Sequence, residues 1–256
     1  MQSLLAVLAG AICGLSLGLI GGGGSILAVP LLLYIVGVSD PHSAIGTSAL
    51  AVAGTACFNL WRHARARHVR WPTAVVFAVA GVCGSLLGSS VGKRINGDKL
   101  LVLFALLMIV IAYLMQLERK SVPTGPESHN FVGVAKLVAV GFPTGGLAGF
   151  FGIGGGFLIV PGLILAARIP LVDAIGSSLV SVGAFAATTA ANYALSGLVE
   201  WKIAAEYIAG GAIGGWLGVS AAHRLAQTRS ALNKVFGIVL VTIALYMLYR
   251  SRSEFT

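Results

Sequence analysis

Two glycine-rich segments, one in each half of the chain, carry the residues best suited to holding a ligand. Residues 18–30 read G-L-I-G-G-G-G-S-I-L-A-V-P, and residues 149–161 read G-F-F-G-I-G-G-G-F-L-I-V-P. Consecutive glycines interrupt a helix, and the first N–H groups of the helix that follows are free to bind an anion, which the helix dipole also favours. The segments therefore predict an anion site made of backbone amides, with no charged side chain required.

The candidate site residues form three groups. The two segments themselves would supply backbone amides and one hydroxyl, from Gly22, Gly23, Gly24, Ser25, Gly154, Gly155 and Gly156. Hydroxyls that follow each segment either complete the anion site or bond the carbonyl one helical turn back, and these are Thr47, Ser48, Ser177 and Ser178. The carboxamides of Asn59 and Asn192 either line the pathway of the ligand or form hydrogen bonds between helices.

Other interpretations of the glycines and cysteines explain the sequence less well than an anion site does. A nucleotide loop needs a Lys-Ser/Thr pair after the glycines or a βαβ unit around them, and the sequence has neither. Close helix packing explains the small-x-x-x-small spacing of Gly81, Gly84 and Gly88 better than it explains four successive glycines. The three cysteines lie in apolar segments without metal-ligand spacing, so we expect no metal and no cofactor.

The elements that must position these residues belong in a membrane. Hydrophobic residues make up 57% of the 256 residues and charged residues 10%, whereas a soluble domain carries about 25% charged residues. Apolar runs of about 20 residues are long enough to cross a hydrocarbon layer of about 30 Å. The composition predicts an all-α integral membrane protein.

The apolar segments are arranged as two repeats of five, which gives 8–10 membrane segments. The expected segments are 3–20, 26–38, 43–61, 72–92 and 99–117 in the first repeat and 134–151, 157–169, 174–196, 202–222 and 231–249 in the second. The second segment of each repeat spans only about 20 Å, so each repeat should contain a half-helix that begins at the glycine break. We place the first repeat at 1–117, a polar linker at 118–130, and the second repeat at 131–256.

The repeats match beyond the glycines, and their loop charges predict that they are inverted. A-I-G-T-S at 44–48 corresponds to A-I-G-S-S at 174–178. Arginines gather in the loop at 62–70, whereas Glu200 and Lys202 cancel in the corresponding loop. Because short basic loops stay cytoplasmic, these two loops should lie on opposite sides of the membrane, although Arg250 and Arg252 would then lie outside. Inverted repeats with broken helices are typical of secondary transporters.

The paired G-x-x-G-x-G-G motif with its later proline, and the A-I-G-T/S-S element after each copy, resemble the TauE/SafE-type sulfite exporter family over nearly the whole chain. The first copy departs from the second by carrying Gly22 where the second has Ile153. The resemblance implies a secondary carrier of sulfite, sulfoacetate or a related organosulfonate in the bacterial cytoplasmic (inner) membrane, working by alternating access. Its partners would be the small anionic substrate and the lipid bilayer.

Several alternatives remain open at the level of sequence. A passive anion channel or a carrier of a non-sulfur organic anion could use the same site, and the sequence allows coupling to a proton or counter-ion and assembly into a homo-oligomer. Asp40 and Asp173 precede apolar segments, where they are expected to cap helices. The apolar segments contain no nucleophile–base pair, so we expect no enzyme, and the arginine loop is not expected to bind nucleic acid.

Overall fold

A computed structural model of the chain describes residues 1–20, 22–116, 131–224 and 229–252, so the expected linker at 118–130 lies outside the described residues. Every regular element in the described part is a helix, which confirms the all-α class. The first repeat contains α1 (Gln2–Ile20), η1 (Gly22–Leu27), α2 (Ala28–Leu31), η2 (Leu32–Val36), α3 (Pro41–Arg65), α4 (Trp71–Gly92) and α5 (Gly97–Gln116). The second contains α6 (Phe131–Phe151), α7 (Gly156–Ala167), α8 (Leu171–Ala194), α9 (Trp201–Arg224) and α10 (Arg229–Arg252).

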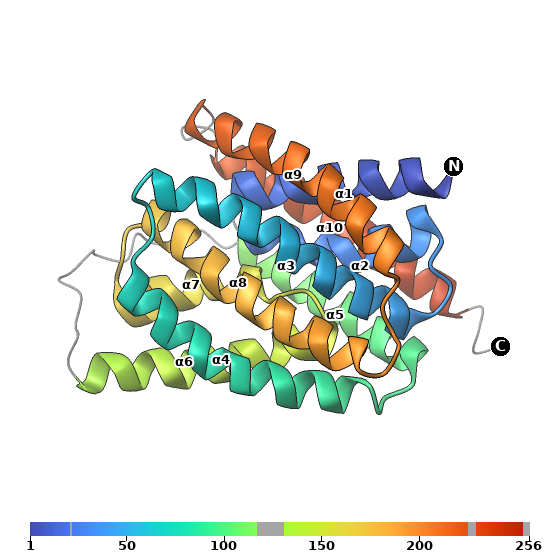
Figure 1. Cartoon of the computed structure of the whole chain (residues 1–256), viewed down its shortest axis with the longest axis horizontal. Helices are drawn as coiled ribbons and strands as arrows, with labels where there is room; N and C mark the ends of the chain where they lie inside the picture. The colour runs from blue at the N-terminus through green and yellow to red at the C-terminus, as the bar shows by residue number, and fades with distance from the viewer. Residues whose placement is uncertain (21, 117–130, 225–228, 253–256) are drawn as a thin grey trace.

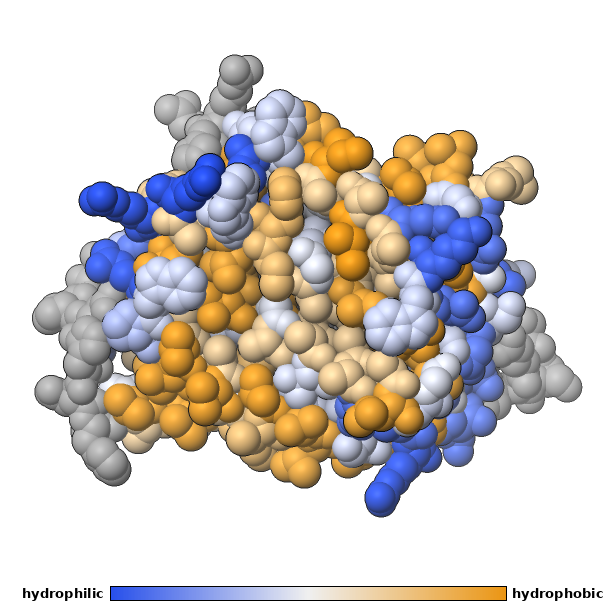
Figure 2. All heavy atoms as spheres, viewed as in Figure 1, coloured by the Kyte–Doolittle hydropathy of each residue, from blue (hydrophilic) through white to orange (hydrophobic). Residues whose placement is uncertain are grey.

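The helices have the lengths and surface of a membrane protein. Within the described residues, six helices are long and apolar enough to cross a membrane, and these belong to α1, α3, α4, α5, α6 and α8. Two shorter apolar helices, Gly24–Val36 and Gly156–Ala167, fall where the half-helices are expected. Hydrophilic residues gather at opposite ends of the molecule and hydrophobic residues cover the region between them (Figure 2). A lipid layer would face this apolar region.

The two repeats interlock. The first helix of each repeat packs on the fourth helix of the other, α1 on α9 and α6 on α4, while α3 packs on α8 and α5 on α10 (Figure 1). The start of α3, at Gly46, lies against Leu198 just after α8, and the start of α8, at Gly176, lies against His68 just after α3. The equivalent helices α3 and α8 are therefore antiparallel, as inverted repeats require. Their orientation in a membrane stays a prediction.

Glycines bring the backbones of the interlocked helices into contact. A Cβ atom on Gly84 of α4 would overlap the carbonyl oxygen of Phe142 in α6, and one on Gly214 of α9 would overlap that of Ala11 in α1. Small residues drive helix association in membranes because they allow this close approach. These glycines therefore serve helix packing, as their spacing predicts.

The two aspartates expected to cap helices behave differently. Asp40 caps α3, because its carboxylate accepts a hydrogen bond from the N–H of Ser43 at 2.7 Å. The cap predicted for Asp173 is wrong, since α8 begins at Leu171 after Pro170 and Asp173 lies in its first turn. The Asp173 carboxylate instead accepts a hydrogen bond from Nε of Arg70 at 2.7 Å. It thereby ties the loop before α4 to the start of α8.

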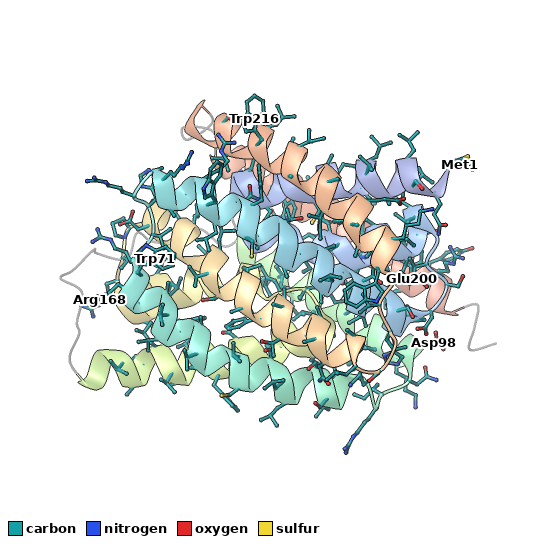
Figure 3. All side chains as sticks on the ribbon, in the orientation of Figure 1. Met1, Trp71, Asp98, Arg168, Glu200 and Trp216 are labelled. Carbon is teal, nitrogen blue, oxygen red and sulfur yellow. The ribbon has the colours of Figure 1, made fainter. Side chains whose placement is uncertain are left out.

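The arginine loop and its counterpart lie at opposite ends of the molecule. Trp71, which directly follows the arginine loop, and Arg168 are at one end, while Met1, Asp98 and Glu200 are at the other (Figure 3). The positive-inside rule applied to this arrangement predicts that the arginine end faces the cytoplasm. The N-terminus would then lie on the outer side.

Candidate functional site

The second glycine segment forms a sharp break between α6 and α7. Gly152, Gly154 and Gly155 have φ angles of 69°, 65° and 67°, in the left-handed region that costs other residues about 1–2 kcal/mol. Gly155 is the N-cap of α7, whose 12 residues span about 18 Å. The second repeat therefore contains the predicted half-helix, and its first free N–H groups belong to the residues that follow the break.

The first glycine segment is built less regularly. It starts as the 3-10 helix η1 at Gly22, continues through only four residues of α-helix in α2, and ends in the π-helix η2. Gly24 lies directly against the backbone of α1, where a Cβ atom would overlap the amide nitrogen of Leu17. Its carbonyl oxygen also accepts a hydrogen bond from the Cys13 thiol at 3.4 Å. Close packing on α1 therefore replaces the open α-helical N-terminus expected for this copy.

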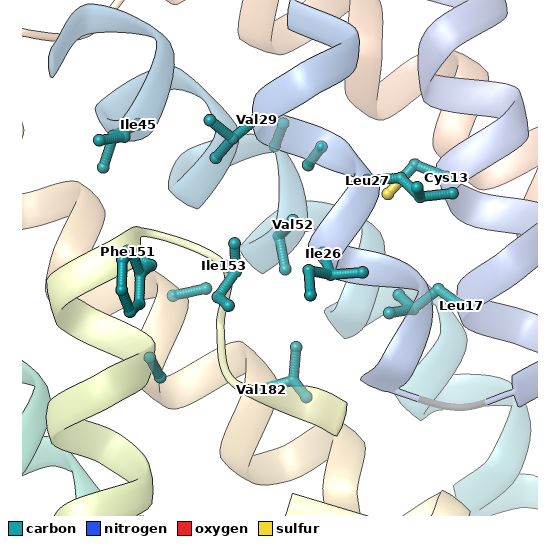
Figure 4. Close-up of a cluster of buried hydrophobic side chains, with 14 of the residues drawn as sticks. Cys13, Leu17, Ile26, Leu27, Val29, Ile45, Val52, Phe151, Ile153 and Val182 are labelled. Carbon is teal, nitrogen blue, oxygen red and sulfur yellow. The ribbon is translucent and has the colours of Figure 1, made fainter. Parts of the chain in front are cut away.

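The two segments meet near the centre of the molecule. Gly154 lies between Val52 of α3 and Val182 of α8, so that a Cβ atom on it would be 3.1 Å from a methyl group of each. These valines occupy equivalent positions in the two repeats. Ile26 of η1 and Ile153 of the second segment lie beside them and are fully buried (Figure 4). Residues 24–31 and 151–156 are all buried, so these parts of the two segments are closed to solvent in this structure.

All five predicted hydroxyls are buried, and that of Ser48 contacts the second glycine segment. Ser48 Oγ lies 2.8 Å from the carbonyl oxygen of Ile45 and 3.3 Å from that of Gly152, so it meets the second glycine segment directly. Ser178, its equivalent in α8, donates to the carbonyl oxygen of Ile175 at 2.8 Å. Ser25 is fully buried in η1. The bond to the preceding turn and the contact with the glycine segment therefore coexist at Ser48.

Thr47 and Ser177 hold the ends of the α3–α8 pair through hydrogen bonds with the backbone. Thr47 Oγ1 accepts a hydrogen bond from the N–H of Glu200 at 2.9 Å. Ser177 Oγ accepts one from the N–H of Arg70 at 2.8 Å. The two bonds are equivalent under the repeat, and each fixes the residue that precedes the next helix. In this structure both hydroxyls therefore serve as acceptors for backbone N–H groups.

We expect that Thr47→Val and Ser177→Ala lower stability without altering transport by the folded protein. Each change leaves a backbone N–H without its acceptor, which costs about 1–3 kcal/mol when the group is buried. Thermal unfolding in detergent and flux per folded molecule would be measured for both. Thr242→Val is the control, because Thr242 donates only within its own exposed helical turn. Unchanged melting together with lost flux would return these hydroxyls to the anion site.

The two predicted asparagines are in different environments and are not brought together. Asn192 joins α8 to α4, donating to Ser89 Oγ at 2.6 Å and accepting from Lys93 Nζ at 2.8 Å. This is the interhelical role that was one of its two interpretations. Asn59 is fully buried, and its amide nitrogen and oxygen have no hydrogen-bond partner in the part of the chain that the structure describes. Asn59 thus remains a candidate for contact with a ligand.

Gly152 was not predicted as a site residue, yet it shares the left-handed conformation of Gly154 and Gly155, whereas the predicted Gly156 is already helical. The duplication carried a signal for it, because Gly152 matches Gly21 in the first copy. Lys93 was also missed. It binds Asn192 and Ser196 across helices, and its position in the sequence gives no local sign of this contact.

Comparison with known proteins gives a consistent result. The family model described as sulfite exporter TauE/SafE matches residues 6–247. A probable membrane transporter protein of Xylella fastidiosa is 50% identical over 253 residues, covering 98% of this chain and 97% of the relative. The probable membrane transporter protein YunE of Bacillus subtilis is 30% identical over 274 residues, covering 97% and 98%. One from Haemophilus influenzae is 28% identical over 267 residues, covering 95% and 97%. No solved structure is a significant match.

Proposed function

Because the chain belongs to the TauE/SafE sulfite exporter family of membrane transporters, we propose that it is a secondary carrier of a small sulfur-containing oxyanion. Sulfite, sulfoacetate and related organosulfonates are the proposed substrates. The protein is a multi-pass membrane protein, and the bacterial cytoplasmic membrane is the location that fits its bacterial relatives. Family membership assigns it to transporters rather than to enzymes.

The observation that carries the proposal is the break at Gly152–Gly155 before α7. Three left-handed glycines end α6 and start a helix within the buried centre of the molecule. Unpaired N–H groups and the helix dipole at such a start attract an anion, and glycine lets the ligand approach the backbone. Ser48 brings a hydroxyl to the same break. A sulfonate or sulfite group has the charge and the acceptor oxygens that this arrangement suits.

Burial of residues 24–31 and 151–156 supports a carrier over an open channel. A substrate can reach Gly154 only if the surrounding helices move, because residues 151–156 are buried. The repeats also make two equivalent interfaces, α1 with α9 and α6 with α4. In transporters with inverted repeats, rearrangement of equivalent elements about a fixed site opens it to one side and then to the other. We therefore propose alternating access.

Ligand-induced thermal stabilisation of the purified protein would test the proposed substrate class. The panel comprises sulfite, thiosulfate, sulfoacetate, sulfate, acetate, phosphate and chloride. A ligand at 100 times its dissociation constant adds about 2.7 kcal/mol, and we expect this only with sulfur-containing anions. A shift confined to carboxylates would instead identify a carrier of organic anions.

Flux into proteoliposomes would separate a carrier from a channel. We expect saturable uptake that is accelerated by substrate on the opposite side of the membrane. Unitary currents in planar bilayers, without such counter-exchange, would contradict the carrier mechanism and favour a passive anion channel.

A further inference from the structure

One face of α3 connects the second glycine segment to the buried Asn59. Residues spaced three or four apart share a helix face, and this face consists of Ser48, Val52, Thr55 and Asn59. Ser48 contacts the carbonyl oxygen of Gly152, and Val52 lies against Gly154. Asn59 follows two turns after Val52, toward the end of the molecule that carries the arginine loop. It is therefore on the path along α3 from the glycine break to that end.

The carboxamide of Asn59 is buried, and among the described residues neither its donor Nδ2 nor its acceptor Oδ1 has a hydrogen-bond partner. Its side chain is 0% exposed. Buried polar atoms in proteins are nearly always paired with protein, water or ligand. A carboxamide offers two N–H donors and one acceptor oxygen, so a partner for both ends must itself accept and donate.

A glycine of the neighbouring helix α9 packs directly against the Asn59 amide. A Cβ atom on Gly215 of α9 would be 2.8 Å from Asn59 Nδ2 and closer still to Oδ1, so a larger residue there would displace the amide. On its other side Gly215 approaches Gly18 of α1, where a Cβ atom would be 2.8 Å from the Gly215 carbonyl oxygen. Gly18 begins the first glycine-rich segment. Asn59 thus lies one helix backbone away from the start of that segment.

On the equivalent face of α8, a buried aromatic ring fills the space and the hydroxyl group equivalent to the Asn59 amide is hydrogen-bonded. Where α3 has Thr55, α8 has Phe185, a fully buried ring that stacks on Phe77 with centroids 6.3 Å apart. Where α3 has Asn59, α8 has Thr189, whose hydroxyl donates to the carbonyl oxygen of Phe185 at 2.9 Å. The two repeats therefore differ in chemistry at equivalent positions. A polar ligand on this face finds unpaired groups on α3 and none at the equivalent positions of α8.

We propose that Asn59 binds the transported anion directly and selects an anion that carries its own hydrogen-bond donor, such as hydrogensulfite or a hydroxysulfonate. Nδ2 donates to an oxygen of the anion, and Oδ1 accepts the hydrogen of its hydroxyl group. A fully deprotonated anion of similar size leaves Oδ1 buried and unpaired, which weakens its binding. The inference rests on the proposed function and narrows its substrate class.

Two sulfonates of equal charge test this selection, namely hydroxymethanesulfonate and methanesulfonate. They differ by one hydroxyl group, and their affinities would be obtained from ligand titrations of thermal stability in detergent. We expect the wild-type protein to bind hydroxymethanesulfonate about tenfold more tightly or better. Asn59→Leu should abolish this preference while retaining weak binding of both sulfonates.

Two further variants keep the test decisive. Asn59→Thr introduces the residue found at the equivalent position of α8, where its hydroxyl can bond the preceding turn, and it should also lose the preference. Thr189→Val alters the equivalent position of α8 and should keep the preference. The role of Asn59 is overturned if the wild-type protein does not prefer hydroxymethanesulfonate over methanesulfonate. It is also overturned if an Asn59 variant has a lower melting temperature but retains this preference. In either case the partner of the Asn59 amide would be a structural water. Failure of the wild type to bind any sulfur anion overturns the proposed function as well.

Discussion

Gly154→Ala is expected to reduce transport by about 100-fold or more while the protein remains folded in the membrane. Alanine at a φ of 65° costs about 1–2 kcal/mol, which a protein with a typical stability of about 5–15 kcal/mol tolerates. The added Cβ would also be 3.1 Å from methyl groups of Val52 and Val182, at the point where the repeats meet. It therefore occupies space beside the amides proposed to hold the anion. Flux into proteoliposomes, normalised to folded protein, would measure the loss, and Gly154→Leu should complete it.

Two other left-handed glycines provide matched controls for backbone strain. Gly37 and Gly197 have φ angles of 83° and 72°, and a Cβ atom on either would meet nothing within 4 Å in the described part of the chain. Gly37→Ala and Gly197→Ala should therefore lower the melting temperature as Gly154→Ala does but preserve flux. Normal flux in Gly154→Ala would remove the second glycine segment from the substrate site. Equal loss of flux in all three variants would show that strain alone is responsible.

The second large effect is expected on stability, at two adjacent glycines of α6. A Cβ atom on Gly145 would overlap the backbone of Gly81 in α4, whereas the nearest atom to one on Gly146 would be 3.8 Å away. Gly145→Ala must separate α6 from α4, at a cost of about 3 kcal/mol or more. Gly146→Ala meets only ordinary contact and gains up to about 1 kcal/mol of helix propensity. Thermal unfolding in detergent should thus give a lower melting temperature for Gly145→Ala than for Gly146→Ala.

Substitution of the glycines that face α6 and α1 is also expected to lower stability. Gly84→Leu and Gly214→Leu should lower the melting temperature before they affect the chemistry of the site, because both side chains would enter a neighbouring backbone. Similar melting of Gly145→Ala and Gly146→Ala would contradict the close approach of α4 and α6. It would also weaken the packing explanation for Gly84 and Gly214.

The elements of the fold were predictable because hydrophobic length and glycine position are local signals. The expected segment 157–169 appears as α7 over Gly156–Ala167, and 72–92 appears as α4 over Trp71–Gly92. The first glycine segment was less predictable, since its glycines are as numerous but it begins as a 3-10 helix in which Gly24 packs on the α1 backbone. Composition indicates that a helix breaks, and the neighbouring helix determines the form of the break.

The roles of polar residues depended on contacts that the sequence does not contain. Thr47 bonds the backbone of Glu200, which is 153 residues away, so nothing near Thr47 identifies its partner. Asn59 and Asn192 carry the same group on apolar helices, yet only Asn192 meets Ser89 and Lys93. Their side chains were therefore indistinguishable by type and position. Tertiary packing alone separates a structural carboxamide from one that remains unpaired.

Because the first helix of each repeat packs on the fourth helix of the other, the fold can be completed only late in synthesis of the protein. α1 leaves the ribosome well before α9, the helix on which it packs most extensively. The face of α1 that packs on α9 therefore stays uncovered in the bilayer until α9 has been inserted. Multi-helix chains with unpaired surfaces are vulnerable to misassembly during this interval. A chain truncated before α9 would leave this face of α1 without its partner, so α1 exposes its packing glycines for as long as α9 is missing.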